Sequence, residues 1–230
     1  PRVNNGNDYI QPSWELLNAF LCTDGKQIDE SPLYDPRNPF KNRDPRCSGT
    51  IVEFGTAFCG FIYQPHPDTL KTRNVNTGVL VANKDSRGVD QYGSFNALAW
   101  RKGIDDDWAK ERKPEHDQIV IRYADVLLIY AEAKIDLGGS QIDQSVLDAI
   151  NKVRARAYKV DYTQTAKYPA VTTLNQSELR NILRWERRME FAFEGLRNPD
   201  IIRWKTAEKV LNTTMYGMID PPEQRTKIIQ

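Results

Sequence analysis

Between residues 119 and 194 the chain repeats apolar side chains at intervals of three and four, and this feature constrains the fold most strongly. Residues at that spacing lie on one face of an α-helix, which buries the apolar face against a neighbour. The pattern predicts helices over residues 119–137, 145–158 and 176–194. The fold class expected from it is mainly α.

The first predicted helix carries apolar residues on nearly every side. Its first stripe consists of Val120, Ala124, Leu127, Leu128, Ala131 and Ile135. A second stripe consists of Tyr123, Val126, Tyr130 and Ala133. The remaining polar face is narrow, so we expect a helix that is buried on most sides. Because only two helices follow, we also expect another polypeptide segment to pack against the second stripe.

The third predicted helix has a clear start and an unusual face. Asn175 as the N-cap and Glu178 three residues later form a capping box. The apolar face of this helix includes Leu179, Ile182, Leu183 and Phe193. Glu186 and Glu190 fall on the same face by their spacing. The pattern therefore places two charges where a core is expected.

These two carboxylates admit a catalytic and a structural interpretation. At a separation of four residues their Cβ atoms lie about 6 Å apart, not far from the carboxylate spacing of a retaining glycosidase. The same segment contains Arg184, Arg187, Arg188, Arg197 and Arg203. A general acid needs a raised pKa, whereas guanidinium groups lower the pKa of a carboxylate. We therefore predict that Glu186 and Glu190 are buried in an ion-pair network, and we predict no catalytic residue.

The first half of the chain is less regular and richer in Asn, Asp, Gly, Pro and aromatic residues. We expect a short helix over residues 12–21. The strands expected from β-branched and aromatic runs cover residues 50–54, 60–64, 78–82 and, more weakly, 95–101. The change of style near 113–115 divides the chain into a loop-rich part, 1–118, and a helical part, 119–230.

Charge and cysteine usage exclude several classes of function. The 32 basic and 31 acidic residues give a net charge of +1, unlike the one-sided basic surface of a nucleic-acid-binding protein. No apolar run approaches the roughly 20 residues that span a bilayer. Cys22, Cys47 and Cys59 lack metal-binding spacing, and the histidines, His66 and His116, are far apart. We predict no metal site and no cofactor.

Six short segments carry a resemblance to a known family. They are residues 24–26 (DGK), 42–46 (NRDPR), 121–133 (IRYADVLLIYAEA), 150–157 (INKVRARA), 186–197 (ERRMEFAFEGLR) and 202–204 (IRW). In this order they resemble the signatures of the SusD/RagB family, and they are spread over most of the chain.

The resemblance implies a mainly α, SusD-like fold with tetratricopeptide-type helix packing and a loop-rich part that carries a few short strands. It also implies a surface-exposed lipoprotein of the bacterial outer membrane. Such proteins capture glycans, or peptides in some members, and pass them to a SusC-type TonB-dependent transporter. The resemblance implies no enzymatic activity and no nucleic-acid partner.

The chain departs from the family pattern in its length. The family's lipidated cysteine and most of its tetratricopeptide-like helices lie upstream of the position where this chain begins, so the lipid that attaches such a protein to the membrane is not present here. The usual proline-rich C-terminal segment is also missing after residue 230. We therefore expect this chain to be a C-terminal portion of such a protein.

The expected ligand-binding residues lie in the irregular segment 55–112. A glycan platform needs exposed aromatic rings for the C–H faces of sugars, and planar polar groups for their hydroxyls. The residues that fit are Tyr63, Tyr92 and Trp108, with Arg73, Asn74 and Asn96 as polar companions. By contrast, Arg43, Asp44 and Arg46 of the NRDPR turn are expected to fix a loop by charge-assisted hydrogen bonds.

Three classes of function stay open at this point. Non-enzymatic glycan capture with a transporter is the leading hypothesis, and a peptide is the alternative ligand. A glycoside hydrolase would require Glu186 or Glu190 to line an open cleft. A helical-repeat scaffold for protein partners would have no concave aromatic surface.

Overall fold

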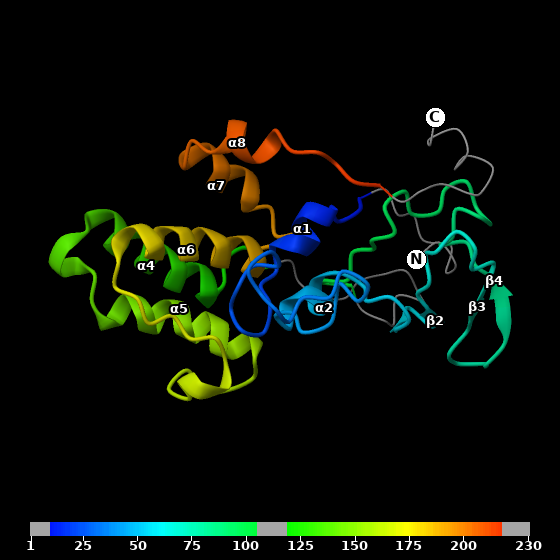
Figure 1. The fold of residues 1–230 in the computed structure, drawn as a ribbon, viewed down its shortest axis with the longest axis horizontal. Coiled ribbons are helices and arrows are strands. Elements are labelled where there is room, and N and C mark those ends of the chain that lie inside the picture. Colours follow the sequence, from blue (N-terminus) through cyan, green and yellow to red (C-terminus); the bar gives the residue numbers. More distant parts are fainter. Residues whose placement is uncertain (1–9, 105–118, 218–230) are drawn as a thin grey trace. The chain divides into compact units, whose positions relative to one another are not determined.

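The computed structural model describes residues 10–104 and 119–217, which form two compact units (Figure 1). Among the described residues, the loop-rich unit consists of 10–17, 48–104 and 213–217, and the helical unit consists of 18–47 and 119–212. Residues 18–47, which the sequence division places with the loop-rich part, cluster with the helices. Each unit is described by itself.

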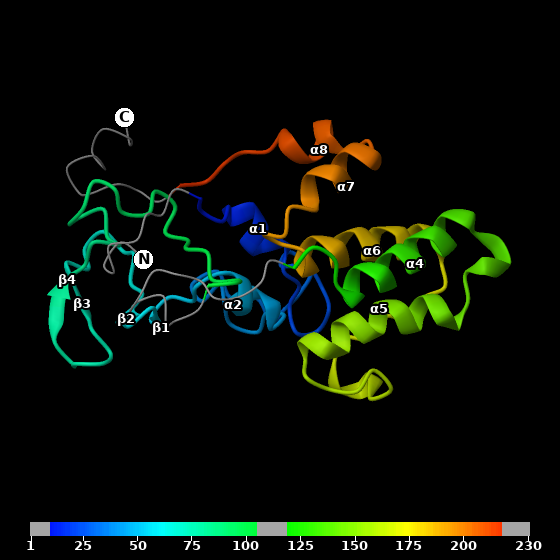
Figure 2. The same ribbon diagram turned by 180° about the vertical axis from the view of Figure 1, so that it is seen from behind.

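Three long helices form the centre of the helical unit: α4 (Tyr123–Leu137), α5 (Gln144–Ala157) and α6 (Gln176–Glu190). They lie side by side in both views and enclose one apolar core (Figures 1 and 2). Fully buried members of this core are Leu128, Ala131, Ile135, Val146, Ile150 and Leu179. Burying an aliphatic side chain of this size stabilises the fold by roughly 1.5–3 kcal/mol.

Shorter elements complete the helical unit. Two 3₁₀ turns, η2 (Gly139–Gln141) and η3 (Thr165–Lys167), lie in the connections that follow α4 and α5. Two short helices, α7 (Arg197–Arg203) and α8 (Ala207–Leu211), follow α6.

The three long helices confirm the prediction from periodicity, but two of their ends differ from it. Helix α4 begins at Tyr123 and not at residue 119, because Arg122 is extended with φ −135° and ψ 160°. Helix α6 ends at Glu190 and not at residue 194. Phe193 (φ 62°) and Gly195 (φ 78°) adopt left-handed backbone conformations there, which a right-handed helix cannot contain.

The predicted cap of α6 is present with one change. The side chain of Asn175 accepts a hydrogen bond from the backbone N–H of Glu178 at 3.1 Å. The Glu178 carboxylate does not return to the backbone of Asn175. It accepts a hydrogen bond from the hydroxyl of Thr173 at 2.7 Å, and this hydroxyl accepts the N–H of Asn175 at 3.1 Å. Thr173 therefore joins the two halves of the capping box.

Helix α4 is buried on one face only. Its first stripe packs into the core, whereas Tyr123, Val126 and Tyr130 of the second stripe are 67%, 52% and 44% exposed. The expectation of burial on most sides is therefore not met within the described residues. The segment expected to cover the second stripe stays a prediction.

The loop-rich unit contains two small antiparallel hairpins. Strand β1 (Ala57–Phe58) pairs with β2 (Phe61–Ile62), and β3 (Lys71–Arg73) pairs with β4 (Leu80–Ala82). The register places Phe58 opposite Phe61 and Thr72 opposite Val81. One buried apolar cluster of this unit consists of Val52, Phe58, Cys59, Tyr63 and Ala99.

Three expected elements of the first half are shorter than predicted, and two differ in kind. The helix expected over residues 12–21 is α1 (Trp14–Ala19). The strand expected over 50–54 is wrong, because Thr50 ends helix α2 (Arg46–Thr50). Ile51 then makes a single antiparallel bridge to Trp100, and this bridge is all that forms from the expected strand 95–101. The expected strands 60–64 and 78–82 shrink to β2 and β4.

Within the described residues, no helix is long and apolar enough to cross a membrane. The same part of the chain holds no group of three or more His, Cys, Asp or Glu side chains that could bind a metal ion. Its three cysteines are buried and form no disulfide with one another.

Candidate functional site

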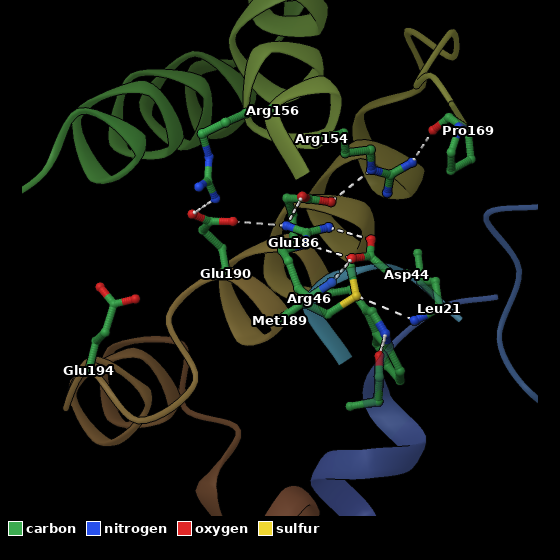
Figure 3. Close-up of polar contacts among 12 residues, drawn as sticks. Leu21, Asp44, Arg46, Arg154, Arg156, Pro169, Glu186, Met189, Glu190 and Glu194 are labelled. Carbon is green, nitrogen blue, oxygen red and sulfur yellow. Dashed lines mark hydrogen bonds and ion pairs between the residues drawn. The ribbon is translucent and has the colours of Figure 1, made fainter. Parts of the chain in front are cut away.

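The two helical glutamates are joined by one arginine from the NRDPR turn (Figure 3). Arg46 lies between them, with Nη1 at 2.6 Å from Oε1 of Glu186 and 3.0 Å from Oε2 of Glu190. The other terminal nitrogen, Nη2, is 2.7 Å from Oδ2 of Asp44. The side chains of Glu186 and Glu190 are 0% and 1% exposed. Arg46 thus neutralises carboxylates that have been removed from water.

Each glutamate also bonds further arginines, one in the case of Glu186 and two in the case of Glu190. Oε2 of Glu186 accepts a hydrogen bond from Nε of Arg154 in α5 at 2.7 Å (Figure 3). Oε1 of Glu190 accepts one from Nη2 of Arg156 at 2.6 Å and another from Nη1 of Arg122. Every carboxylate oxygen of this pair is therefore occupied. The prediction of buried, arginine-paired glutamates is confirmed.

The pKa of Glu190 lies below its ordinary value of 4.5. Burial by itself raises this pKa, but the charges of Arg46, Arg122 and Arg156 lower it by more. A general acid needs the opposite shift, since it must hold its proton near neutral pH. The geometry and the pKa of Glu190 both favour the structural interpretation.

A second ion-pair group ties α6 to α4 and α7. Arg187 bonds Oδ2 of Asp200 at 2.9 Å and Oδ1 of Asp125 at 3.0 Å. Arg203 bonds Oε2 of Glu132 at 2.7 Å, and the indole of Trp204 donates to Oε1 of Glu132 at 2.6 Å. Sequence reasoning named the arginines of this group but missed the acidic partners, because those partners lie on other helices.

Arg43 has the loop-fixing role that the sequence predicts. Its guanidinium donates to the carbonyl oxygen of Pro39 at 2.8 Å and to that of Phe20 at 2.5 Å. The side chain is buried. One charged group therefore holds two separate turns of backbone together.

Three of the six expected ligand residues carry internal hydrogen bonds. Tyr63 is 1% exposed, and its hydroxyl donates to the carbonyl of Ala97 at 2.9 Å. Oδ1 of Asn74 accepts the backbone N–H of Asn76 at 2.9 Å and so shapes the turn after β3. Nδ2 of Asn96 donates to the carbonyl of Pro12 at 2.7 Å. Ligand contact by these residues stays a prediction, and the buried ring of Tyr63 suits it least.

Two of the other three expected residues are exposed. Tyr92 is 62% exposed, and Arg73 lies on the surface at the end of β3. Trp108 lies outside the described residues. Sequence reasoning missed Phe95, which is 61% exposed and carries the guanidinium of Arg87 4.1 Å above its ring centre. The segment 87–96 therefore presents two exposed aromatic side chains, Tyr92 and Phe95. The sequence signal that could have found Phe95 is its position three residues after Tyr92.

Known proteins share both the sequence and the fold of this chain. The sequence pattern of the SusD family matches residues 1–224. A SusD-like protein of Formosa agariphila is 31% identical over 164 residues, which cover 63% of this chain and 29% of that protein. Another SusD-like protein of the same organism is 38% identical over 124 residues, which cover 53% of this chain and 22% of that protein.

Two solved structures from Bacteroides fragilis are similar in fold. A SusD-like carbohydrate-binding protein has a TM-score of 0.68 at 32% identity, covering 92% of this chain and 39% of that one. A second SusD-like protein has a TM-score of 0.61 at 27% identity, covering 90% and 38%. The chain thus spans less than half the length of these relatives.

The segments that carry the family resemblance also meet in space. Residues 42–46, 150–157 and 186–197 supply Arg46, Arg154 and the two glutamates of the ion-pair network. The family pattern and the similar solved structures agree, and the chain belongs to the SusD family.

Proposed function

We propose that this protein captures glycans at the bacterial cell surface without cleaving them. Family membership supports this function, since a similar solved structure is described as a SusD-like carbohydrate-binding protein. The observation that carries the proposal is the exposed segment 87–96, where Tyr92 and Phe95 are 62% and 61% exposed. Aromatic faces of this kind stack against the C–H faces of sugar rings.

The ligand surface proposed here is in the loop-rich unit. Tyr92 and Phe95 supply the stacking faces, and Arg73 and Arg87 supply donors for sugar hydroxyls. Trp108, outside the described residues, is proposed as a further stacking residue on sequence grounds alone. The unit has few regular elements, which is typical of a binding surface built from loops on a fixed core.

The same proposal includes delivery and location. The captured glycan passes to a SusC-type TonB-dependent transporter, and the protein is a surface-exposed lipoprotein of the outer membrane. Family membership supports both statements. A peptide is the alternative ligand. A hydrolase is disfavoured because the carboxylates of Glu186 and Glu190 are buried and bonded to arginines.

Affinity electrophoresis in gels that contain starch, xylan, mannan or laminarin tests glycan capture. At least one of these polysaccharides is expected to retard the wild-type protein. Tyr92→Ala removes one stacking face and is expected to weaken that binding about tenfold, which corresponds to the energy of a good aromatic contact. Calorimetry with a casein digest on the same samples tests the peptide alternative.

Leu211→Ala is the control, because Leu211 is also exposed (69%) but lies in α8 of the helical unit. It is expected to leave retardation unchanged. Equal weakening by both substitutions would remove the proposed surface. Binding of the peptides and of no polysaccharide would replace the glycan by a peptide.

A further inference from the structure

A pocket of about 400 Å³ lies within the helical unit. Its wall is formed by the loop 21–30, Arg154 of α5, the segment 169–173 and one side of α6. Small-molecule sites commonly have volumes of about 300–1,000 Å³. Leu21, Ile182 and Trp185 give this pocket an apolar and aromatic side. No residue expected from the sequence to bind a ligand lines it.

Several polar side chains that line the pocket have donors or acceptors without a hydrogen-bond partner among the described residues. The side chains of Gln27, Glu30 and Asn181 make no hydrogen bond with any other described residue. Arg154 is 6% exposed, and it uses Nε for Glu186 and Nη1 for the carbonyl of Pro169 (Figure 3). Its Nη2 has no partner among the described residues. Nη2 of Arg154 is therefore a hydrogen-bond donor that is left over in the lining of the pocket.

The charges around the pocket favour a neutral ligand. Asp24 and Glu30 are acidic, and the positive charge of Arg154 is already balanced by Glu186 at 2.7 Å. A carboxylate on the ligand would meet an excess of negative charge, and an ammonium group would meet Arg154. Sugar hydroxyls fit this mixture because each can donate to a carboxylate and accept from an amide or a guanidinium.

We propose that this pocket is a second saccharide site that holds one or two rings of a neutral sugar. Trp185 provides the stacking face, and Asn181, Gln27 and Glu30 bind the hydroxyls. The class of ligand rests on the proposed function, whereas the position and the donors come from the geometry of the helical unit. The site is distinct from the surface at Tyr92.

Calorimetry with glucose, galactose, mannose, xylose, maltose and cellobiose tests this site in the complete protein. At least one of these sugars is expected to bind saturably. Asn181→Ala and Glu30→Gln are each expected to weaken that binding about tenfold, because each removes hydrogen bonds to the sugar. Both side chains are exposed and make no internal hydrogen bond, so neither change is expected to disturb the fold.

Matched controls are available on the neighbouring short helices. Asn198→Ala in α7 and Glu208→Gln in α8 change exposed side chains that do not line the pocket. They are expected to leave the affinity for the sugar unchanged. Glucuronic acid is expected to bind more weakly than glucose, since its carboxylate would face Asp24 and Glu30.

The possible outcomes separate this inference from the proposed function. If polysaccharides bind but none of the six sugars does, or if both pocket variants bind as tightly as the wild type, the second site is overturned and glycan capture stands. If no polysaccharide and no sugar binds the wild type, both proposals fail. Preferential binding of glucuronic acid, lost in Asn181→Ala, would overturn the neutral ligand.

Discussion

Arg46 is the central cation of the buried ion-pair network in the helical unit. It satisfies Glu186, Glu190 and Asp44 at once, with N–O distances of 2.6, 3.0 and 2.7 Å. The pKa of Arg46 is raised well above its ordinary value, since these carboxylates outweigh the opposing effect of burial. Removing one partner from such a buried group leaves an uncompensated charge, which costs much more than the intact pair contributes.

Glu186→Gln is therefore expected to destabilise the protein strongly. The change leaves Arg46 and Arg154 without one carboxylate in a site that is 0% exposed. The expected loss in the free energy of unfolding is about 3–5 kcal/mol, measured by urea denaturation. Glu208→Gln, on the exposed side of α8, is the control and is expected to change stability by less than about 0.5 kcal/mol. Equal stability of the two variants would mean that the network contributes no specific stabilisation.

Acidification is expected to weaken the same network. The pKa values of Glu190 and Asp44 are lowered in the folded protein, in each case because nearby arginine charges outweigh the effect of burial. A lowered folded-state pKa gives stability that is fully present above the unfolded value, 4.5 for Glu190, and is lost as the pH falls through the folded value. Melting temperatures between pH 7 and pH 2.5 should therefore fall below about pH 4.5. Glu190→Gln should show a smaller fall over the same range, and an identical pH dependence would contradict this account.

The identity of these arginine partners could not be predicted from the sequence. Spacing within α6 places Glu186 and Glu190 on the apolar face, and local arginines suggest that they are paired. Arg46, however, lies 140 residues before Glu186 in the chain. Arg187, which directly follows Glu186 in the chain, bonds Asp125 and Asp200 instead. The spacing along a helix determines on which face of the helix a residue lies. The fold determines which residues of other elements pack against that face.

The start of helix α6 is stabilised by its N-terminal cap. Asn175→Ala removes the acceptor for the backbone N–H of Glu178, whereas the backbone N–H of Asn175 still donates to Thr173. The expected cost is about 1 kcal/mol in the free energy of unfolding. Chemical denaturation measures it, with Asn198→Ala as a control that lacks a capping role. A loss no larger than that of the control would show that packing alone positions the start of α6.

The long helices could be predicted because the periodic pattern extends over many residues. The residues at which these helices begin and end could not be predicted from that pattern. Residues 191–194 continue the helical pattern of α6, yet Phe193 takes a left-handed conformation that ends it. In the loop-rich unit, β1 and β2 are two residues long, so no alternating pattern can specify them. The prediction of a strand at 50–54 was wrong because the first residue of this short run, Thr50, is the last residue of α2. Short apolar runs do not distinguish a strand from the end of a helix.

At the scale of the molecule, the sequence identifies the family better than it identifies the ligand surface. Tyr63 and Tyr92 both lie in the irregular segment 55–112, but one is 1% exposed and the other 62%. Exposure is set by how loops pack, which no local pattern records. The pocket beside Trp185 was not predicted either, since its lining comes from four separate segments. Both surfaces are consequences of the fold.

The central claim is that the molecule binds a glycan and releases it unchanged. The most direct test is to incubate the protein with a retained polysaccharide and then measure the chain length of the recovered glycan by chromatography. Recovery at full length, after binding that Tyr92→Ala weakens, is the expected result. Shortened products that disappear with Glu190→Gln would contradict the account, because they would require a glutamate held by three arginines to act as a catalyst.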